Sequence, residues 1–453
     1  MTTAIQIVIL LLGLLVYYKK PKWYMLYWMI TYPILVPFLC YVGGISTDED
    51  SYTVIHHFPG TFMYLNLWIL IDSIMIRKKK VQGLRGLFIT AVVLVAFFVY
   101  QTAALSINNF SYLYLNVKSI GVFVLSFAVL AINDRIRPDE ESLKRLISFL
   151  IILETVGVLL NLVGVRFYRA TFSVVREAFD ANLSGTFQSG QALGDFMATL
   201  FLLICYYFFC KRVLPKAKFL VLFLCAMFCI ISAGSRMCFA IALMGLIVTV
   251  FFYQKKHRFL LAGMFIVGYL GLSFLANYKG GDISSNEGLN RIVEGLSSFT
   301  QSKKSGYDDE STMRLSQMVL EDYMSKTPII GLGLSSQGDD FDVISGNVST
   351  VKNLVADAHL AFLVIDIGVL GVFLYLLFFY QMFRYWRKNI QKEYIKTLII
   401  TFVFFLIFSI TEEGFWDSKC FPIILVFYFS LFAQQERPIS SLNKNKIQNK
   451  YGV

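Results

Sequence analysis

A histidine that opens an apolar run is the first residue in this sequence whose type and position could carry chemistry. His359 follows a polar, glycine-containing segment at 331–338 and stands in Asp357-Ala358-His359, where we expect a hydrophobic helix to begin and run unbroken to about residue 381. An imidazole titrates near neutral pH and can accept a proton there. It can also simply anchor a helix end, so its chemistry depends on its neighbours.

Three arginines are candidates for binding an anion beside this histidine. Arg236 stands in a tight turn, Gly234-Ser235-Arg236, between two apolar runs; Arg176 precedes another run; and Arg314 lies in the long segment 278–356. A guanidinium stays charged at physiological pH and donates paired hydrogen bonds to a phosphate or diphosphate. Each arginine alone could equally reach toward lipid headgroups. Three arginines on the same side as a histidine favour a diphosphate site.

A polar face on one apolar helix is a candidate sugar site. Gln188, Gln191 and Asp195 follow each other at helical spacing, so they share one face. Asp195 could line an outward-open cavity and receive a sugar. Equally, its carboxylate could pair with Lys118 or Arg236, because charges inside apolar spans normally face a cavity or a partner.

The long segment 278–356 is predicted to be partly helical. Acids at 308–310 and Ser311 suit a helix start, so we expect a helix to about residue 325 that carries Arg314. Gly331 and Gly333 would then let the chain turn tightly back to the membrane. Their backbone amides could also face an anion.

The elements that position these residues are membrane helices. The chain has 453 residues, of which 57% are hydrophobic, against about 45–50% in soluble domains. Runs of roughly 20 apolar residues recur throughout, long enough to cross a bilayer core. We expect an all-α fold, a polytopic transmembrane helical bundle of about 12–14 spans with one large, partly helical extracytoplasmic loop. His56 and His57 fall in a predicted short loop at 44–59. The predicted helices are 4–18, 23–43, 60–76, 87–106, 113–132, 146–165, 187–210, 219–234, 237–253, 259–277, 357–381, 397–412 and 420–434.

Charge distribution predicts the orientation of this bundle. Most of the 41 lysine and arginine residues fall in every second connection, so these connections are predicted to be cytoplasmic. The net charge of +11 then reflects topology and contact with anionic membrane lipids, and a nucleic-acid partner is not expected. His359, Arg176, Arg236 and Arg314 fall on the outward side. The basic clusters lie at 19–22, 77–85, 135–145, 211–218, 255–258, 384–396 and 437–450.

The same pattern divides the chain into five segments. Two groups of helices precede the large extracytoplasmic loop, a third group follows it, and a basic cytoplasmic tail ends the chain. The boundaries are 1–165, 166–277, 278–356, 357–434 and 435–453.

No cofactor is expected from the sequence. The seven cysteines lie in or beside apolar runs, where we interpret them as small packing residues. No cluster has the spacing of a metal site, so no metal is expected.

The order of these motifs resembles the O-antigen ligase/polymerase family, which includes the oligosaccharide repeat unit polymerases of the bacterial envelope. The resemblance covers about residues 166–380. It rests on 183–193 (LSGTFQSGQAL), Gly234-Ser235-Arg236, the arginine-bearing helix of the long loop, Pro328-x-x-Gly331-x-Gly333 and Asp357-Ala358-His359.

This resemblance implies a metal-independent glycosyltransferase of the bacterial cytoplasmic (inner) membrane, with its site facing outward. Its substrate would be a polyprenyl-diphosphate-linked oligosaccharide, polymerised into O-antigen, capsule or exopolysaccharide. His359 would accept the acceptor's proton, and Arg236 and Arg314 would hold the diphosphate, with Arg176 as a third. A chain-length regulator and a flippase of the same pathway are the implied protein partners.

Other functions remain open at this point. A ligase of the same family would transfer a finished glycan to a lipid or protein acceptor. A flippase-like polysaccharide or lipid transporter belongs to a different class, and internal repeats or broken helices, which mark many transporters, are not evident in the sequence. A scaffolding membrane protein would tolerate alanine at the outward arginines.

Overall fold

The computed structural model is a helical bundle. It describes residues 2–35, 48–79, 83–104, 110–165, 167, 183–187, 190–233, 236–253, 329–331, 359–411 and 420–432. Within these ranges the chain is mostly helical and forms no strands beyond an isolated antiparallel bridge between Ile390 and Phe432. This agrees with the all-α prediction.

Most of the described helices follow predicted apolar runs, whereas the predicted helix 259–277 lies outside the described residues. The longer ones are α1 (Thr2–Lys19), α2 (Tyr24–Ile30), α4 (Asp48–Ile71), α5 (Arg85–Ala104), α6 (Phe110–Ile132), α7 (Glu140–Leu162), α9 (Gly190–Cys205), α10 (Lys216–Ser232), α11 (Arg236–Tyr253), α17 (His359–Asn389), α18 (Ile395–Thr411) and α19 (Phe421–Ser430). Three end in π-helical turns: η2 (Thr31–Leu35), η3 (Asp72–Ile76) and η5 (Tyr206–Cys210). Short 3₁₀ segments are η1 (Pro21–Trp23), η4 (Asp134–Ile136) and η7 (Lys392–Tyr394).

Among the described residues, four helices are long and apolar enough to cross a membrane: Arg85–Ala104, Glu140–Leu162, Ala192–Cys210 and Ile367–Asn389. At 1.5 Å per residue, about 20 residues match the roughly 30 Å of a bilayer core. Shorter apolar helices stand beside them: Ala4–Lys19, Gly60–Ile76, Ile120–Ile132, Cys238–Tyr253 and Phe421–Ser430. These lengths and compositions indicate a membrane protein, and the predicted number of spans stays a prediction.

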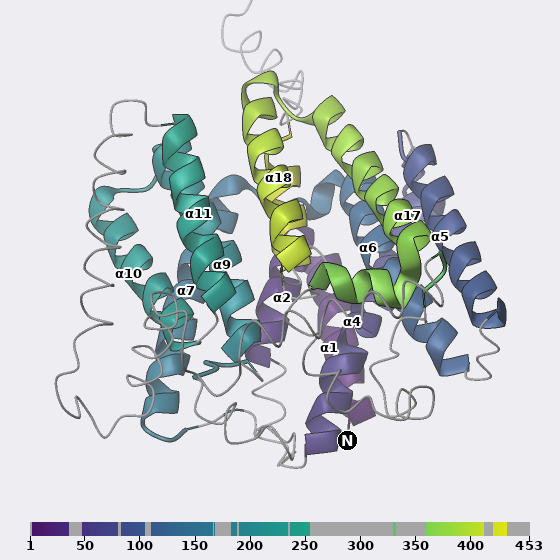
Figure 1. The fold of residues 1–453 in the computed structure, drawn as a ribbon, viewed down its shortest axis with the longest axis horizontal. Helices are drawn as coiled ribbons and strands as arrows, with labels where there is room; N and C mark the ends of the chain where they lie inside the picture. The colour runs from purple at the N-terminus through teal and green to yellow at the C-terminus, as the bar shows by residue number, and fades with distance from the viewer. Residues whose placement is uncertain are drawn as a thin grey trace, which may run out of the picture.

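Contacts join several basic connections at one end of the bundle, which we call the basic end. The Nζ of Lys79 lies 2.9 Å from the Oδ1 of Asp134. The Nζ of Lys211 lies 3.0 Å from the Oε2 of Glu140 and donates a hydrogen bond to the hydroxyl of Tyr394. These connections, which the sequence marked as basic, therefore lie at the same end of the bundle. The expectation that this end faces the cytoplasm stays a prediction. α1 runs toward this end from its N-terminus, at the bottom of Figure 1.

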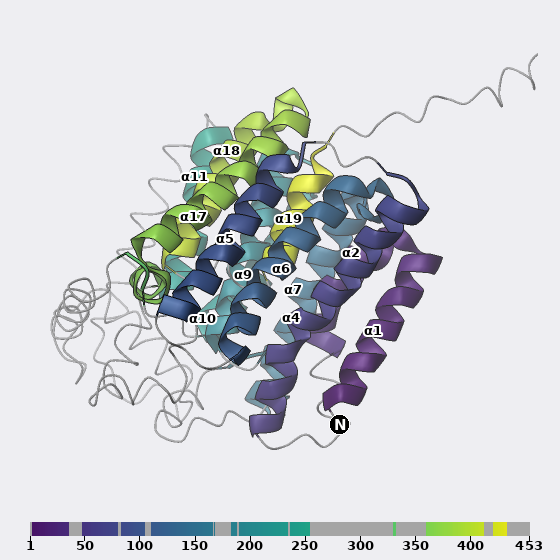
Figure 2. The same ribbon diagram turned by 90° about the vertical axis from the view of Figure 1, so that its right-hand side faces the viewer.

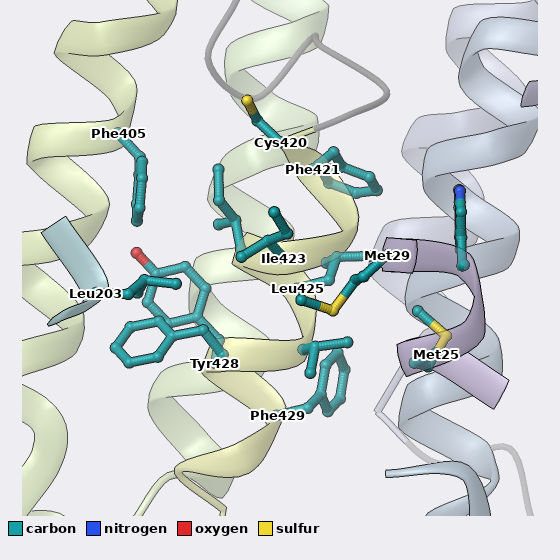
Figure 3. Close-up of a cluster of buried hydrophobic side chains, with 14 of the residues drawn as sticks. Met25, Met29, Leu203, Phe405, Cys420, Phe421, Ile423, Leu425, Tyr428 and Phe429 are labelled. Atoms are coloured by element: carbon teal, nitrogen blue, oxygen red, sulfur yellow. The ribbon is translucent and has the colours of Figure 1, made fainter. Parts of the chain in front are cut away.

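α19 forms the centre of the bundle, as Figure 2 shows. Every residue from Phe421 to Phe429 is buried, so this helix is apolar on all sides and meets protein rather than lipid. Phe421 packs edge-on against Phe123 of α6, and Tyr428 packs against Trp386 of α17. Figure 3 shows Met25 and Met29 of α2 on one side of α19, and Leu203 and Phe405 on the other.

Three features of the helices differ from the sequence prediction. α4 begins at Asp48, so the predicted loop at 44–59 was wrong over most of its length, and His56 and His57 lie in a helix. α9 begins at Gly190 rather than 187, because residues 183–187 form a turn that docks on α7. The prediction of an unbroken helix from His359 to 381 was also wrong.

The helix that begins at His359 reaches Asn389 and is kinked at Gly368 (φ 64°, ψ 179°). Figure 1 shows the part before the kink lying across the bundle and the part after it rising toward the basic end. His359 therefore starts a crosswise segment instead of standing at the mouth of the span.

Candidate functional site

The candidate site residues that the structure describes lie toward the end of the bundle opposite the basic end. Arg236 is the first residue of α11, and His359 is the first residue of α17. Gln191 and Asp195 lie in the first turns of α9. Arg176, Gln188, Arg314 and Gly333 lie outside the described residues, as does most of the long loop.

A short turn from the long loop lies inside the kink of α17. The carbonyl oxygen of Ile329 accepts a hydrogen bond from the backbone N–H of Leu370 at 3.1 Å. A Cβ added to Gly368 would lie 2.4 Å from the oxygen of Ile329 and 2.5 Å from the nitrogen of Gly331. Gly331 is buried and has a φ of +68°, which confirms the predicted tight turn at this glycine.

Gln101, near the end of α5, holds the same turn from the other side. Its Nε2 donates a hydrogen bond to the carbonyl oxygen of Ile330 at 2.5 Å, and its side chain is only 1% exposed. The turn is therefore bonded to two helices, α5 and α17, which pack against each other. Gln101 was not singled out in the sequence, because its partner is a backbone atom far away in the chain.

A second turn docks on the buried carboxylate of Glu154 in α7. The Oε2 of Glu154 accepts from the backbone N–H of Thr186 at 3.0 Å, and its Oε1 accepts from the Thr186 hydroxyl at 2.7 Å. Gly185 has a φ of +61°, and a Cβ there would lie 2.6 Å from Oε2 of Glu154. This buried acid of α7 therefore binds a turn of the chain.

The same turn also reaches the connection that leads to Arg236. The backbone N–H of Leu183 donates to the carbonyl oxygen of Ser232, the last residue of α10, at 3.3 Å. The backbone N–H of Ser184 donates to the Oδ1 of Asn161 at 3.1 Å. Residues 183–187 thus fix the end of α10 against α7, and α11 begins only a few residues later.

Asp195 is packed inside the protein. Its side chain is 1% exposed, and its Oδ1 accepts a hydrogen bond from the Cys238 thiol at 3.1 Å. Because Cys238 lies two residues after Arg236, this bond ties the start of α9 to the start of α11. Cys238 has a polar partner, whereas the sequence suggested a packing role alone.

Buried polar contacts join several segments at the basic end. Asp72 accepts hydrogen bonds from the Tyr17 hydroxyl and from the Arg77 guanidinium, and Asn133 bonds both Tyr17 and Ser73. Three segments that are distant in the sequence meet in this network. Since buried polar groups with partners specify one packing, this end has one well-defined arrangement.

Lys211 connects three further segments at the basic end. Burial lowers the pKa of its ammonium, but hydrogen bonds to Tyr394 and Glu140 outweigh that and hold the pKa above its usual value. Lys211 therefore stays charged and links the segment after α9 to the start of α7 and to η7, just before α18. It is a structural contact, distant from the candidate site.

Within the described ranges no group of three or more His, Cys, Asp or Glu side chains could hold a metal ion. Comparisons with protein-family models, with curated proteins and with solved structures find no match for this chain.

Proposed function

We propose that this protein is a membrane glycosyltransferase that polymerises polyprenyl-diphosphate-linked oligosaccharide repeat units into O-antigen, capsule or exopolysaccharide. The reaction would take place at the outer leaflet of the bacterial cytoplasmic membrane. The observation that supports it is the shared position of two helix starts. Arg236 begins α11 and His359 begins α17, both toward the end opposite the basic end.

The proposed reaction is a substitution at an anomeric carbon. The acceptor hydroxyl of one repeat unit attacks that carbon, the bond to the diphosphate oxygen breaks, and the hydroxyl proton passes to His359. Arg236 and Arg314 hold the leaving polyprenyl diphosphate, with Arg176 as a third contact. Two guanidinium groups can stabilise the charge that develops on the leaving group, so the step needs no metal.

The proposed sugar contacts are polar side chains in the first turns of α9 and just before this helix. Gln188 and Gln191 supply amide donors and acceptors, and Asp195 supports them from within the protein through its bond to Cys238. Gly333 is the proposed backbone contact to the anion, because Gly331 is buried against Gly368.

The proposal is tested by glycan lengthening in proteoliposomes that contain purified protein and a polyprenyl-diphosphate-linked repeat unit. We expect the wild type to produce a ladder of products. Arg236→Ala and Arg314→Ala should abolish it, and His359→Ala should lower kcat by about 10²–10⁴-fold, the usual contribution of a general base.

Arg145→Ala is the matched control for the arginine variants. Arg145 lies at the basic end, pairs with Glu141 and has a side chain that is 75% exposed. Its substitution should leave the ladder unchanged. Ladders from both Arg236→Ala and Arg314→Ala at the wild-type rate would overturn the proposed site, and single transfers without lengthening would indicate a ligase instead.

A further inference from the structure

The turn Ile329–Gly331 is bound at two consecutive carbonyl groups by two different helices. Ile329 accepts from the backbone of Leu370 in α17, and Ile330 accepts from the side chain of Gln101 in α5. Each helix therefore supplies one of the donors that hold the turn's backbone in place.

The shape of α17 is matched to this turn. A helix interrupted at Gly368 leaves room for the turn's backbone, and a Cβ at that position would lie only 2.4 Å from an oxygen that cannot move without losing its bond to Leu370. The kink and the docked turn therefore depend on each other. Without either one, the segment that starts at His359 would not be held in its crosswise direction.

We propose that Gln101 is a positioning residue for the reaction. Gln101 fixes the turn Ile329–Gly331 in the kink at Gly368, and the turn holds the crosswise part of α17 in place. His359 is thereby kept at the position where the acceptor hydroxyl binds. The inference rests on the proposed function, since it assigns Gln101 a role in that same site. Gln101 itself is not a proposed substrate contact, because it is buried and its amide donates to Ile330.

A neutral amide suits this role. The donor must reach a backbone oxygen inside the bundle, and a charged donor there would be costly to bury. Loss of the amide leaves the carbonyl of Ile330 without that donor, which favours release of the turn. Since Ile330 also packs against the apolar core, release exposes its side chain.

The docked turn is tested first without reference to catalysis. Ile330→Cys places a thiol on the turn, and its rate of labelling by a membrane-impermeant maleimide is measured against the parent protein. Adding Gly368→Ala or Gln101→Met should raise the rate roughly tenfold, the change expected when one buried hydrogen bond is lost.

Gly164→Ala is the matched control for Gly368→Ala. Both glycines have positive φ (+89° and +64°), so alanine strains the backbone at both, but nothing lies within 4 Å of a Cβ at Gly164. It should leave the labelling of Ile330→Cys unchanged. Equal labelling in the Gly368→Ala, Gln101→Met and parent backgrounds would overturn the docked turn, whatever the protein's activity.

The positioning role is tested by kinetics in the same proteoliposomes. Gln101→Met should lower kcat by about tenfold or more and alter the acid limb of its pH profile, which reports the general base. A loss of folded protein alone would lower the apparent kcat by the same factor at every pH and would leave the acid limb at the same pH. Gln101→Asn, which keeps a shorter amide, should recover part of the rate.

Thr102→Val is the neighbouring control, because the Thr102 hydroxyl bonds only within its own helix, to Phe98 at 2.8 Å. It should behave as the wild type. Faster labelling in Gln101→Met with unchanged kcat and pH profile would overturn the positioning role. A third outcome is slow labelling of Ile330→Cys in the parent background together with a wild type that lengthens no glycan. That outcome would refute the proposed function and support the docked turn.

Discussion

Two sets of contacts, one at each end of the bundle, differ in kind. At the basic end, side chains bond to side chains: Asp72 with Tyr17 and Arg77, and Lys211 with Glu140 and Tyr394. At the opposite end, helices bind the backbone of docked turns: Gln101 binds the carbonyl of Ile330, Leu370 binds that of Ile329, and Glu154 binds the amide of Thr186.

This difference affects how well each end tolerates substitutions. A side-chain network can lose one member and expose the remaining group to water at a membrane surface. A docked turn requires one donor or acceptor at a fixed place and glycine where the backbone comes close, as at Gly185 and Gly368. The end that carries the candidate site is therefore the less tolerant of substitution.

The largest effect on stability is expected at Glu154. Glu154→Ala leaves the backbone and hydroxyl donors of Thr186 without their acceptor, which should lower the free energy of unfolding by roughly 2–5 kcal/mol. Glu154→Gln keeps one acceptor oxygen and should cost about half as much. Unfolding in detergent micelles measures both, and equal stability of the two variants would contradict the docked turn.

An intermediate effect is expected at Asp72 on the basic end. Its side chain is 4% exposed, but its partner Arg77 is 28% exposed and can turn toward water when the carboxylate is removed. Asp72→Ala should therefore cost roughly 1–3 kcal/mol in the same unfolding measurement. A loss greater than that of Glu154→Ala would reverse the comparison between the two ends.

The smallest effect is expected for the pair of Lys79 and Asp134, whose side chains are 38% and 56% exposed. Lys79→Ala should cost roughly 0.2–1 kcal/mol near neutral pH. Burial acts to raise the pKa of Asp134, but the hydrogen bond and charge of Lys79 lower it below its usual value.

A carboxyl whose pKa is lower in the folded state adds stability above its unfolded pKa, and this is lost as pH falls through the folded value. The difference in melting temperature between wild type and Lys79→Ala should accordingly vanish in acid, and it should shrink at about 1 M salt. A difference that persists at low pH would show that the lysine acts by packing.

Helices and their grouping were largely predictable. The run 87–106 became α5 (Arg85–Ala104) and the run 237–253 became α11 (Arg236–Tyr253), since the length and hydropathy of a span are properties of neighbouring residues. The loop at 44–59 was misjudged because it is polar, although the structure continues the helix through it from Asp48.

The candidate site was predictable only in outline. The sequence identified His359 and Arg236 by their place at helix starts, and the structure begins α17 and α11 at these residues. It did not indicate that Gln101 binds the turn at Ile330 or that Thr186 binds Glu154, because a hydrogen bond to a backbone atom leaves no complementary residue type to find.

By itself, the sequence determined a helical membrane protein with its basic connections grouped at one end, because hydrophobic length and charge act locally along the chain. Only the tertiary structure decided that α19 lies at the centre, that Glu154 binds a turn, and that α17 bends at Gly368 around residues 329–331. Those features depend on the close approach of segments far apart in the sequence, where the space left by a missing Cβ and the position of one backbone oxygen are set by packing.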